Sequence, residues 1–505
     1  MKKLRVLSLL LAALMAMTIV TGCGEGATDT SSVASTESTE EVSSEEEVED
    51  LVGGESSEEA ASEETASTGN ATGTTTNTSS KKPTSSKANT GVPVVSENPE
   101  LKDAVLPKYD IKPLASGRNK GKKMVTICID WEPTVSWMEA SIKAFQKVYP
   151  DVTLAWKQAS PDLKASKLAV WKNSKSSPDA IYIKPEESWP LLMEKGLVQP
   201  IDQYIKINDP FWADARGTMN ELKYNGKYYM TASSVAPYGW VIYNPTVFKN
   251  AGLETPESLL YKDKWTWETF ENAAKKLTKA NADPTKAKYG IHFRYSQAWH
   301  GTCGMDYIGY KDGKWVSNLN NPVLKSTMEK YFELVKKYSG GGDDPTQTRQ
   351  MLINGQIGMY VTCEGLSQEF PDQAKAGTLV AVCMPRKTDS KVFYNSGVIS
   401  GYCIPEGALC PEGGMAFVTA GMGAGMGLVE IPKTSNADQY TQHQDDLHKY
   451  CYSVITGTVM HFRRLERIMN WWSVTGPVNS GEKSYAAVVA EVEPKIQEEL
   501  NKMSK

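Results

Sequence analysis

Short apolar runs alternate with helical patterns early in the folded part of the chain, and this alternation constrains the fold more than any other feature. Met124–Ile129 and Ala180–Ile183 are continuous runs rich in β-branched residues, as expected of strands covered on both faces. Val152–Trp156 is a third strand-like run. Apolar residues recur at helical spacing over residues 135–149 and again around residues 163–171. This alternation predicts an α/β domain with a largely parallel sheet.

A different pattern follows and predicts a second domain. Asn225-Gly226 separates two short strand-like runs, which is a strong signal for a hairpin with a two-residue turn. The strand-like run 239–244 ends at Pro245. A helix is expected over residues 266–279, because Thr266 is a suitable N-cap and glutamates follow in the first turn. Two more strand-like runs precede residue 384, and the stretch from about residue 411 is mainly helical in pattern.

The first 23 residues have the composition of an export signal. A short basic start precedes the apolar run Val6–Val20, which is shorter than the ~20 residues that a transmembrane helix needs. Thr21-Gly22-Cys23 resembles the lipobox of bacterial lipoproteins, in which the cysteine is lipidated and becomes the mature N-terminus. This predicts lipidation at Cys23 and attachment to the extracellular face of the cell membrane of a Gram-positive type of bacterium. The alternative is an ordinary signal peptide with an incidental cysteine.

Residues 24–117 are expected to form a disordered acidic tether. The segment is dominated by Ser, Thr, Glu and Gly, and it has too few apolar side chains to offset the entropy of ordering the chain. Residues 1–100 hold 6 basic and 17 acidic residues, whereas residues 101–505 hold 49 basic and 43 acidic residues. The folded part therefore has a mild positive balance without a basic stripe, and nucleic acid is not an expected ligand.

Several segments of the folded part occur in an order and spacing typical of one protein family. They are Pro178–Tyr182, Gly196–Asp202, Asn225–Tyr229, Val241–Pro245, Ala251–Leu253, Trp265–Phe270, Phe332–Val335, Leu352–Met359 and Met384–Val398. Together, from about residue 120 to residue 420, they resemble the extracellular solute-binding proteins of ABC transporters, of the maltose-binding type. No single segment is decisive; their order and spacing carry the resemblance.

The resemblance implies a periplasmic-binding-protein-like fold of two α/β lobes with hinge crossovers and a C-terminal helical segment. The first lobe would comprise residues 118–240 and 390–505, and the second residues 241–389. A carbohydrate, expected to be an oligosaccharide, would bind between the lobes, and hinge closure would bury it. The loaded protein, expected to be a monomer, would then deliver it to the transmembrane subunits of an ABC permease. No cofactor or metal is expected.

Aromatic and acidic side chains recur where this topology places loops at the cleft. Aromatic rings stack on sugar C–H faces, carboxylates bond hydroxyl groups, and open α/β sheets bind ligands at the carboxyl ends of their strands. Trp131 is the strongest candidate, because a tryptophan between Asp130 and Glu132 is unusual in a core. Trp240 fits the core equally well, since it alternates with Ile242. The candidate ligand-binding residues are Trp131, Glu132, Glu187, Tyr238, Trp240, Trp299, His300 and Glu364.

Two other functions compete with transport. An exported glycoside hydrolase would need a carboxylate pair, such as Asp130 with Glu132 or Glu132 with Glu364, and a ligand sensor would feed a signalling protein. The sequence has no Gly-x-Ser-x-Gly elbow, no His-Glu-x-x-His and no phosphate-binding loop. We therefore expect a binding protein without catalytic residues.

Seven cysteines besides Cys23 leave disulfide pairing open. Export permits disulfides, but an odd number cannot all pair. Cys128, Cys383 and Cys403 lie in apolar strand-like runs and are expected to be buried thiols.

Overall fold

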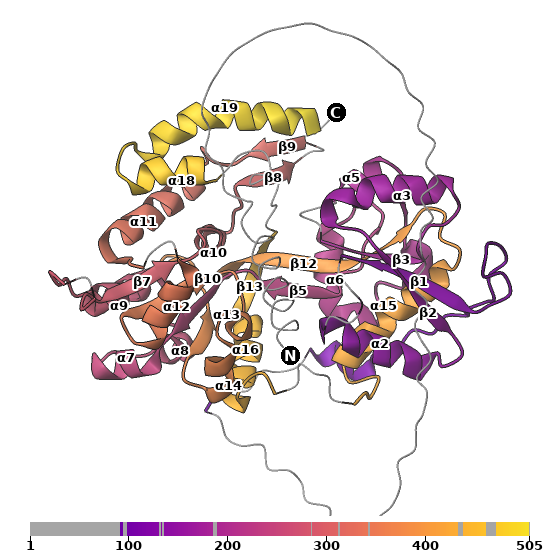
Figure 1. The fold of residues 1–505 in the computed structure, drawn as a ribbon, viewed down its shortest axis with the longest axis horizontal. Coiled ribbons are helices and arrows are strands. Elements are labelled where there is room, and N and C mark those ends of the chain that lie inside the picture. The colour runs from indigo at the N-terminus through magenta and orange to yellow at the C-terminus, as the bar shows by residue number, and fades with distance from the viewer. Residues whose placement is uncertain are drawn as a thin grey trace, which may run out of the picture. The chain divides into compact units, whose positions relative to one another are not determined.

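The structure is a computed structural model (Figure 1). It describes residues 91–93, 98–130, 133, 136–184, 189–283, 285–311, 314–341, 344–432, 438–460 and 471–503. The predicted signal, Cys23 and most of the predicted tether lie outside the described residues. None of the helices in the described ranges combines the length and the apolar character that a membrane span requires.

The first sheet has seven strands in the described part of the chain, and the predicted alternation forms its parallel core. In sheet order, β13 (Ile455–Met460) and β12 (Phe393–Pro405) are followed by β3 (Ala180–Ile183), β1 (Met124–Ile129) and β2 (Thr153–Gln158). β4 (Val198–Gln199) and β5 (Ser234–Pro237) pair antiparallel with β12. α15 (Pro411–Gly425) packs against β1 and against α2 (Ser136–Val148), so β1 is buried as its apolar composition predicts. The other helices of this lobe are α3 (Lys164–Asn173), α5 (Leu191–Glu194) and α6 (Ala213–Glu221).

The second sheet is built from the chain that follows residue 239. Its order is β11 (Val380–Cys383), β6 (Trp240–Tyr243), β10 (Ile357–Thr362) and β7 (Tyr289–Phe293). β8 (Ile308–Lys311) and β9 (Lys314–Ser317) form a separate antiparallel pair. The helices are α7 (Pro245–Asn250), α8 (Pro256–Tyr261), α9 (Trp267–Leu277), α10 (Gln297–His300), α11 (Pro322–Tyr338), α12 (Pro345–Ile353), α13 (Leu366–Glu369) and α14 (Pro371–Ala376). Thr266 caps α9 as predicted, because its side chain accepts a hydrogen bond from the Thr269 N–H.

The chain passes between the two sheets at three places within the described residues. The first is the short link between β5 and β6, and the second is the segment between β11 and β12. The third was not predicted: α16 (Gln442–Val454) packs on β11, and β13 follows it directly and pairs with β12. A Cβ atom at Gly239 in the first link would lie 2.6 Å from Asn395 Oδ1, so any larger residue there would displace the Asn395 side chain. The Asn395 amide donates a hydrogen bond to the Gly239 carbonyl across 3.0 Å.

The C-terminal helices pack differently from the predicted boundary, which grouped residues 390–505 with the first lobe. α15 belongs to that lobe, but α16 lies on β11, and α19 (Tyr485–Met503) packs on β9 and α11. α18 (Trp472–Asn479) also contacts α11. On α19 the buried side chains of Val489, Ile496 and Leu500 provide the packing face, and the Gln497 amide donates to the Trp315 carbonyl and accepts from the Ser317 N–H. These three helices are therefore part of the second lobe.

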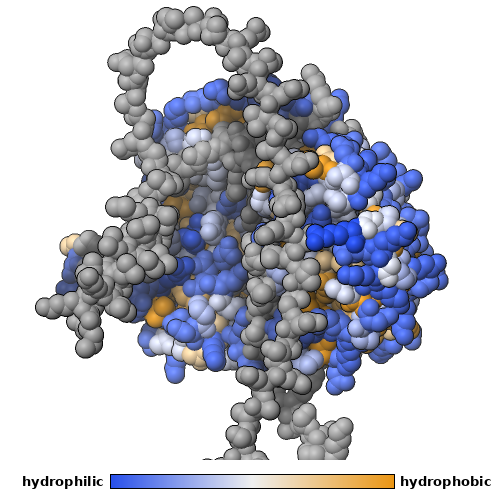
Figure 2. Space-filling model, turned by 45° about the vertical axis from the view of Figure 1, so that its right-hand side comes forward, coloured by the Kyte–Doolittle hydropathy of each residue, from blue (hydrophilic) through white to orange (hydrophobic). Residues whose placement is uncertain are grey.

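The described surface is largely hydrophilic on the face that Figure 2 shows, with small apolar areas between the polar ones. The apolar mass lies inside instead, around the strands of both sheets. Cys128, Cys383 and Cys403 are buried free thiols, as predicted.

Candidate ligand-binding site

The carboxyl end of β1 holds a buried ion pair. Asp130, the residue after β1, lies 2.6 Å from Lys164 Nζ, and both side chains are 1% exposed. Lys164 begins α3, and its ammonium group lies 5.8 Å from the ring centre of Tyr182 in β3. Removing two charges from water is costly, so such a pair fixes geometry more than it adds stability. It anchors the end of β1, directly before the predicted ligand residues Trp131 and Glu132 in the sequence.

Three of the predicted ligand residues lie outside the described residues: Trp131, Glu132 and Glu187. They stay predictions. Asp130, by contrast, is described, and its carboxylate is paired with Lys164. No cluster of three or more potential metal-ligating side chains occurs among the residues that the structure describes.

In the second lobe, two predicted residues share one edge of the sheet. β6 runs antiparallel to β10, with Trp240 opposite Thr362, so the start of β6 lies beside the end of β10. Tyr238 precedes β6 and Glu364 follows β10, and both are half-buried. The Tyr238 N–H donates to the Ser396 carbonyl across 2.6 Å, which ties this edge to β12. β7 is parallel to β10 and ends at the same edge.

Arg294 follows β7 and was not predicted as a site residue. Its Nε lies 3.3 Å from Glu369 Oε1, and its guanidinium carbon lies 5.0 Å from the ring centre of Tyr295. Glu369 is buried and also binds Arg349 Nη1 at 2.8 Å and the Thr362 hydroxyl at 3.1 Å. The shared carboxylate holds the Arg294 side chain at the strand end. An arginine held in this way can present its remaining N–H donors to a polar ligand.

Trp471 completes this edge from the far C-terminal part of the chain. Its indole N–H donates to the Ser296 hydroxyl across 2.8 Å, and its ring centre lies 4.3 Å from that of Tyr307. The ring is only partly buried. Together with Arg294 and Tyr295, Trp471 lines a cavity of about 410 Å³ beside β7. Burial raises the pKa of Tyr295, and the nearby Glu364 carboxylate adds to the effect, so the phenol stays a neutral hydrogen-bonding group.

One signal in the sequence could have pointed to Trp471, namely the adjacent pair Trp471-Trp472 in a region where the family resemblance weakens. That signal does not locate the residue. Only the packing of α18 on α11 brings Trp471 beside the end of β7.

The other predicted aromatic candidates are packed inside the protein. Trp240 is 6% exposed, and its ring contacts His448 and Tyr452 of α16. Trp299 has no exposed surface, stacks on Trp267 and donates its indole N–H to the Thr327 carbonyl across 3.1 Å. A ring in such a position presents no face to a ligand in this conformation. Trp240 and Trp299 act here as core residues.

His300 is also buried, in a polar pair. Its Nε2 lies 2.7 Å from Asp306 Oδ1, and its ring lies 3.9 Å from that of Tyr307. With no exposed surface, the imidazole supports the Tyr307 ring against which Trp471 packs. His300 thus lies behind the candidate site and not on its surface.

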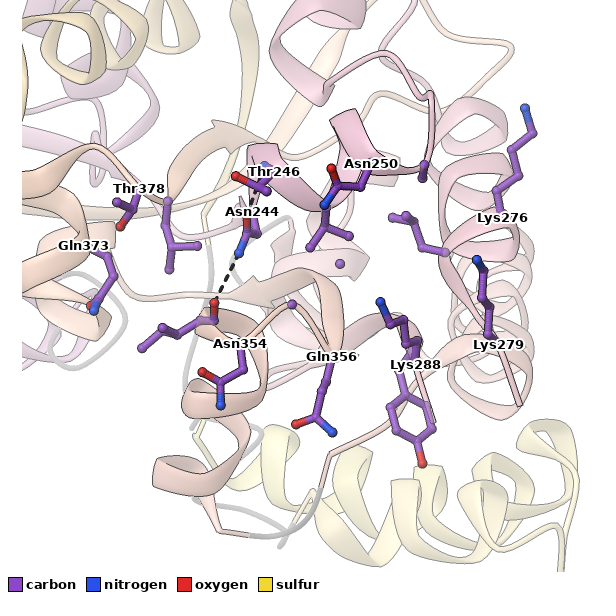
Figure 3. A pocket seen from close by; sticks show the side chains of 18 residues that line it. Asn244, Thr246, Asn250, Lys276, Lys279, Lys288, Asn354, Gln356, Gln373 and Thr378 are labelled. Atoms are coloured by element: carbon purple, nitrogen blue, oxygen red, sulfur yellow. Dashed lines mark hydrogen bonds between the residues drawn. The ribbon is translucent and has the colours of Figure 1, made fainter. Parts of the chain in front are cut away.

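A second cavity lies at the opposite edge of the same sheet (Figure 3). Its volume is about 520 Å³, and it is lined by residues at the amino ends of β7 and β10. Lys276, Lys279 and Lys288 lie along one side of it. None of the predicted ligand residues is among those that line it, so the candidate site remains at the strand ends described above.

The family follows from a comparison with known proteins. A family model for bacterial extracellular solute-binding proteins matches residues 140–424. The chain belongs to this family. The resemblance predicted from the sequence is thereby confirmed.

Individual relatives of this solute-binding protein are distant. A putative binding protein of Brucella abortus (strain 2308) is 23% identical over 292 residues, which cover 54% of this chain and 65% of the relative. The match thus spans less than two thirds of the relative's length.

Solved structures establish the two-lobe α/β fold predicted from the sequence. An ABC substrate-binding protein from Listeria monocytogenes, in complex with cycloalternan, is 18% identical with a TM-score of 0.55, over 75% of this chain and 99% of that one. A cyclo/maltodextrin-binding protein complexed with maltotetraose is 15% identical with a TM-score of 0.57, over 77% of this chain and 100% of that one.

Proposed function

We propose that this protein captures an oligosaccharide between its two lobes and delivers it to an ABC permease in the membrane. The observation that carries the proposal is the set of aromatic, acidic and guanidinium groups at one edge of the second sheet: Tyr238, Arg294, Tyr295, Glu364 and Trp471. Rings for stacking beside groups for hydroxyl bonding are what a sugar needs. The ligands of the two structural neighbours named above, cycloalternan and maltotetraose, support the choice of ligand class.

One aromatic contact between the lobes would favour closure on the ligand. Trp189 follows β3 in the first lobe, and its ring centre lies 5.1 Å from that of Tyr310 in β8, at an interplanar angle of 78°. Trp189 is fixed in turn, because its indole N–H donates to the Leu222 carbonyl across 3.2 Å. Opening of the lobes would break the Trp189–Tyr310 contact, so this contact favours the closed form. A bound ligand would shift the population further by its differential affinity.

The first-lobe half of the site would come from Trp131, Glu132 and Glu187, and the protein would be tethered to the outside of the membrane through a lipid on Cys23. These parts of the proposal rest on the sequence. The protein would act as a monomer and would need no cofactor.

Ligand screening tests the proposal. Thermal unfolding should be measured with mono-, linear and cyclic oligosaccharides, since a ligand at 100 times its dissociation constant stabilises the folded state by about 2.7 kcal/mol. Small-angle scattering with the best ligand should show a smaller radius of gyration. Absence of stabilisation by every saccharide, together with stabilisation by another solute class, would overturn the carbohydrate assignment but not the family.

Two further measurements separate the competing functions. Release of aryl alcohol from aryl glycosides would favour a glycoside hydrolase, whereas we expect binding without turnover. Uptake of the labelled ligand that disappears when the protein is deleted would support transport. A transcriptional response without any uptake would favour a ligand sensor.

A further inference from the structure

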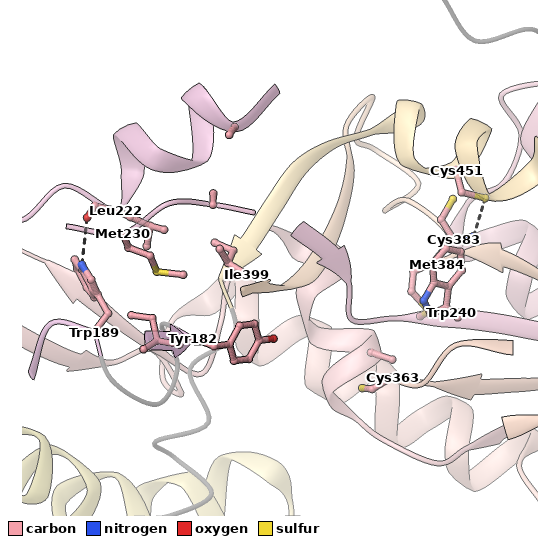
Figure 4. Close-up of a cluster of buried hydrophobic side chains, with 14 of the residues drawn as sticks. Tyr182, Trp189, Leu222, Met230, Trp240, Cys363, Cys383, Met384, Ile399 and Cys451 are labelled. Atoms are coloured by element: carbon pink, nitrogen blue, oxygen red, sulfur yellow. Dashed lines mark hydrogen bonds between the residues drawn. The ribbon is translucent and has the colours of Figure 1, made fainter. Parts of the chain in front are cut away.

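Two buried cysteines from distant parts of the chain contact each other in the second lobe. Cys383 is the last residue of β11, and Cys451 lies near the end of α16. The Cys383 N–H donates to the Cys451 sulfur across 3.3 Å, and neither residue has exposed surface. Figure 4 shows their side chains next to each other, beside Met384 and Trp240.

Neighbouring hydrogen bonds fix this contact in register. The Gln444 side chain accepts from the Ala381 N–H and donates to the Ala381 carbonyl, each across 3.0 Å. Gln444 and Cys451 are seven residues apart, which is two helical turns, so they share one face of α16. Ala381 and Cys383 are likewise two residues apart on β11. The helix is therefore held on the strand at two matched points.

The spacing of the pair is compatible with a disulfide. The contact joins the Cys383 nitrogen to the Cys451 sulfur. The nitrogen is bonded directly to the Cys383 Cα, and only Cβ separates the sulfur from the Cys451 Cα. The Cα atoms therefore cannot lie far outside the range of about 4.4–6.8 Å that disulfides require. The Cys383 and Cys451 side chains also share a hydrogen bond, so the two sulfur atoms already lie near each other.

The pair also lies where the crossovers between the lobes begin. Cys383 is paired with Trp240, the first residue of β6, and is followed by the segment that leads to β12. Cys451 lies three residues before the end of α16, where the chain enters β13. A covalent link here would fix the starting points of two crossovers relative to each other.

We propose that Cys383 and Cys451 form a disulfide in the exported protein and so hold these two crossovers together. The two thiols lose two protons and two electrons to a disulfide-bearing oxidant, either a small-molecule disulfide or a thiol–disulfide oxidoreductase. The oxidant leaves as two thiols. Members of this family are extracellular, and disulfides persist in that environment.

Oxidation must occur before the core closes. The thiolate is the form that attacks a disulfide, and the hydrogen bond with the Cys451 side chain, together with burial, holds the pKa of Cys383 well above its usual range. With no solvent access as well, the folded thiol form should resist oxidation. The protein would therefore exist in two long-lived forms that do not interconvert readily when folded.

Mass analysis of the full-length chain tests the link directly. The exported protein is unfolded and alkylated at harvest without reduction, so that buried thiols are labelled too, and its peptides are compared with those of a sample that is reduced before alkylation. The expected result is a linked peptide pair containing Cys383 and Cys451, while Cys403 is alkylated. Cys403 is a suitable control because it is also fully buried and free. Alkylation of both Cys383 and Cys451 without reduction, or a link to another cysteine, would overturn the proposal.

A stability measurement adds a second readout. The two residues are 68 positions apart, so closing this loop should raise the melting temperature of oxidatively refolded protein by on the order of 5 °C over that of protein refolded with a thiol reductant. Cys451→Ala should abolish that difference, and Cys403→Ala should keep it. Equal melting temperatures of the oxidised and reduced wild-type protein would contradict a link that holds the crossovers.

Discussion

Replacing Trp471 with alanine separates a ligand-facing tryptophan from a packing one, and Trp299→Ala is its matched control. Both indoles donate one hydrogen bond and pack on aromatic rings, Trp471 on Tyr307 and Trp299 on Trp267, Phe270 and Phe293. Trp471 is partly exposed, whereas Trp299 has no exposed surface. The pair therefore differs mainly in whether a ring face is open to a ligand.

The structure sets the size of each effect. Trp471→Ala loses the Ser296 hydrogen bond, about 0.5–1.5 kcal/mol, and the Tyr307 ring contact, about 0.5–1.5 kcal/mol. The free energy of unfolding should thus fall by about 1–3 kcal/mol. Trp299→Ala should cost about 3–5 kcal/mol, because it empties a closed core site. For binding, Trp471→Ala should remove stacking worth about 1–3 kcal/mol, or about 5- to 150-fold in affinity.

Urea unfolding and isothermal titration with the oligosaccharide found by screening measure the two quantities on the same samples. We expect the affinity of folded Trp299→Ala to be close to that of the wild type. If Trp471→Ala binds as tightly as the wild type while its stability falls as far as that of Trp299→Ala, Trp471 is a core residue. The candidate site in the second lobe would then be misplaced.

Three further predictions concern buried ionisable groups. Lys164→Met should lower the free energy of unfolding by about 3–5 kcal/mol, because it strands the Asp130 carboxylate in the core. Urea unfolding measures this loss, and Lys123→Met at the exposed Lys123–Asp151 pair is the control. A loss for Lys164→Met no larger than that of the control would contradict the prediction. Burial raises the pKa of Asp179 to about 6, so its contribution to stability is present below pH ~4 and is lost as the pH rises through 6. The unfolding free energy of the wild type relative to Asp179→Asn should fall by about 2 kcal/mol between pH 4 and pH 7. A difference that does not change with pH would refute the assignment. Burial lowers the pKa of His448 to about 4, so the neutral ring's contribution to folding stability is present above pH ~6.5 and is lost as the pH falls toward 4. The NMR signals of the imidazole protons should titrate with a midpoint near pH 4. A midpoint near ~6.5, the usual value for histidine, would show that the ring is solvated.

The sequence by itself predicted those elements whose signals are local. The strand over 124–129 and the helix cap at Thr266 follow from β-branched runs and capping preferences within a few residues, and the structure shows both. The Asn225-Gly226 turn is likewise present, with both residues at positive φ and Tyr224 paired with Lys227. The ordered set of motifs also sufficed for the family, because it samples much of the chain.

Only the tertiary structure decided which of several similar residues face the site. Trp240, Trp299 and Trp471 look alike as tryptophans in sequence, but the first two are covered by α16 and by Trp267. Trp471 reaches the end of β7 because α18 folds back on α11. The assignment of α16 and α19 to the second lobe likewise rests on packing against β11 and β9, together with glutamine side chains that bond backbone more than 60 residues away. Burial and long-range bonding are properties of packed surfaces, so no window of neighbouring residues contains them.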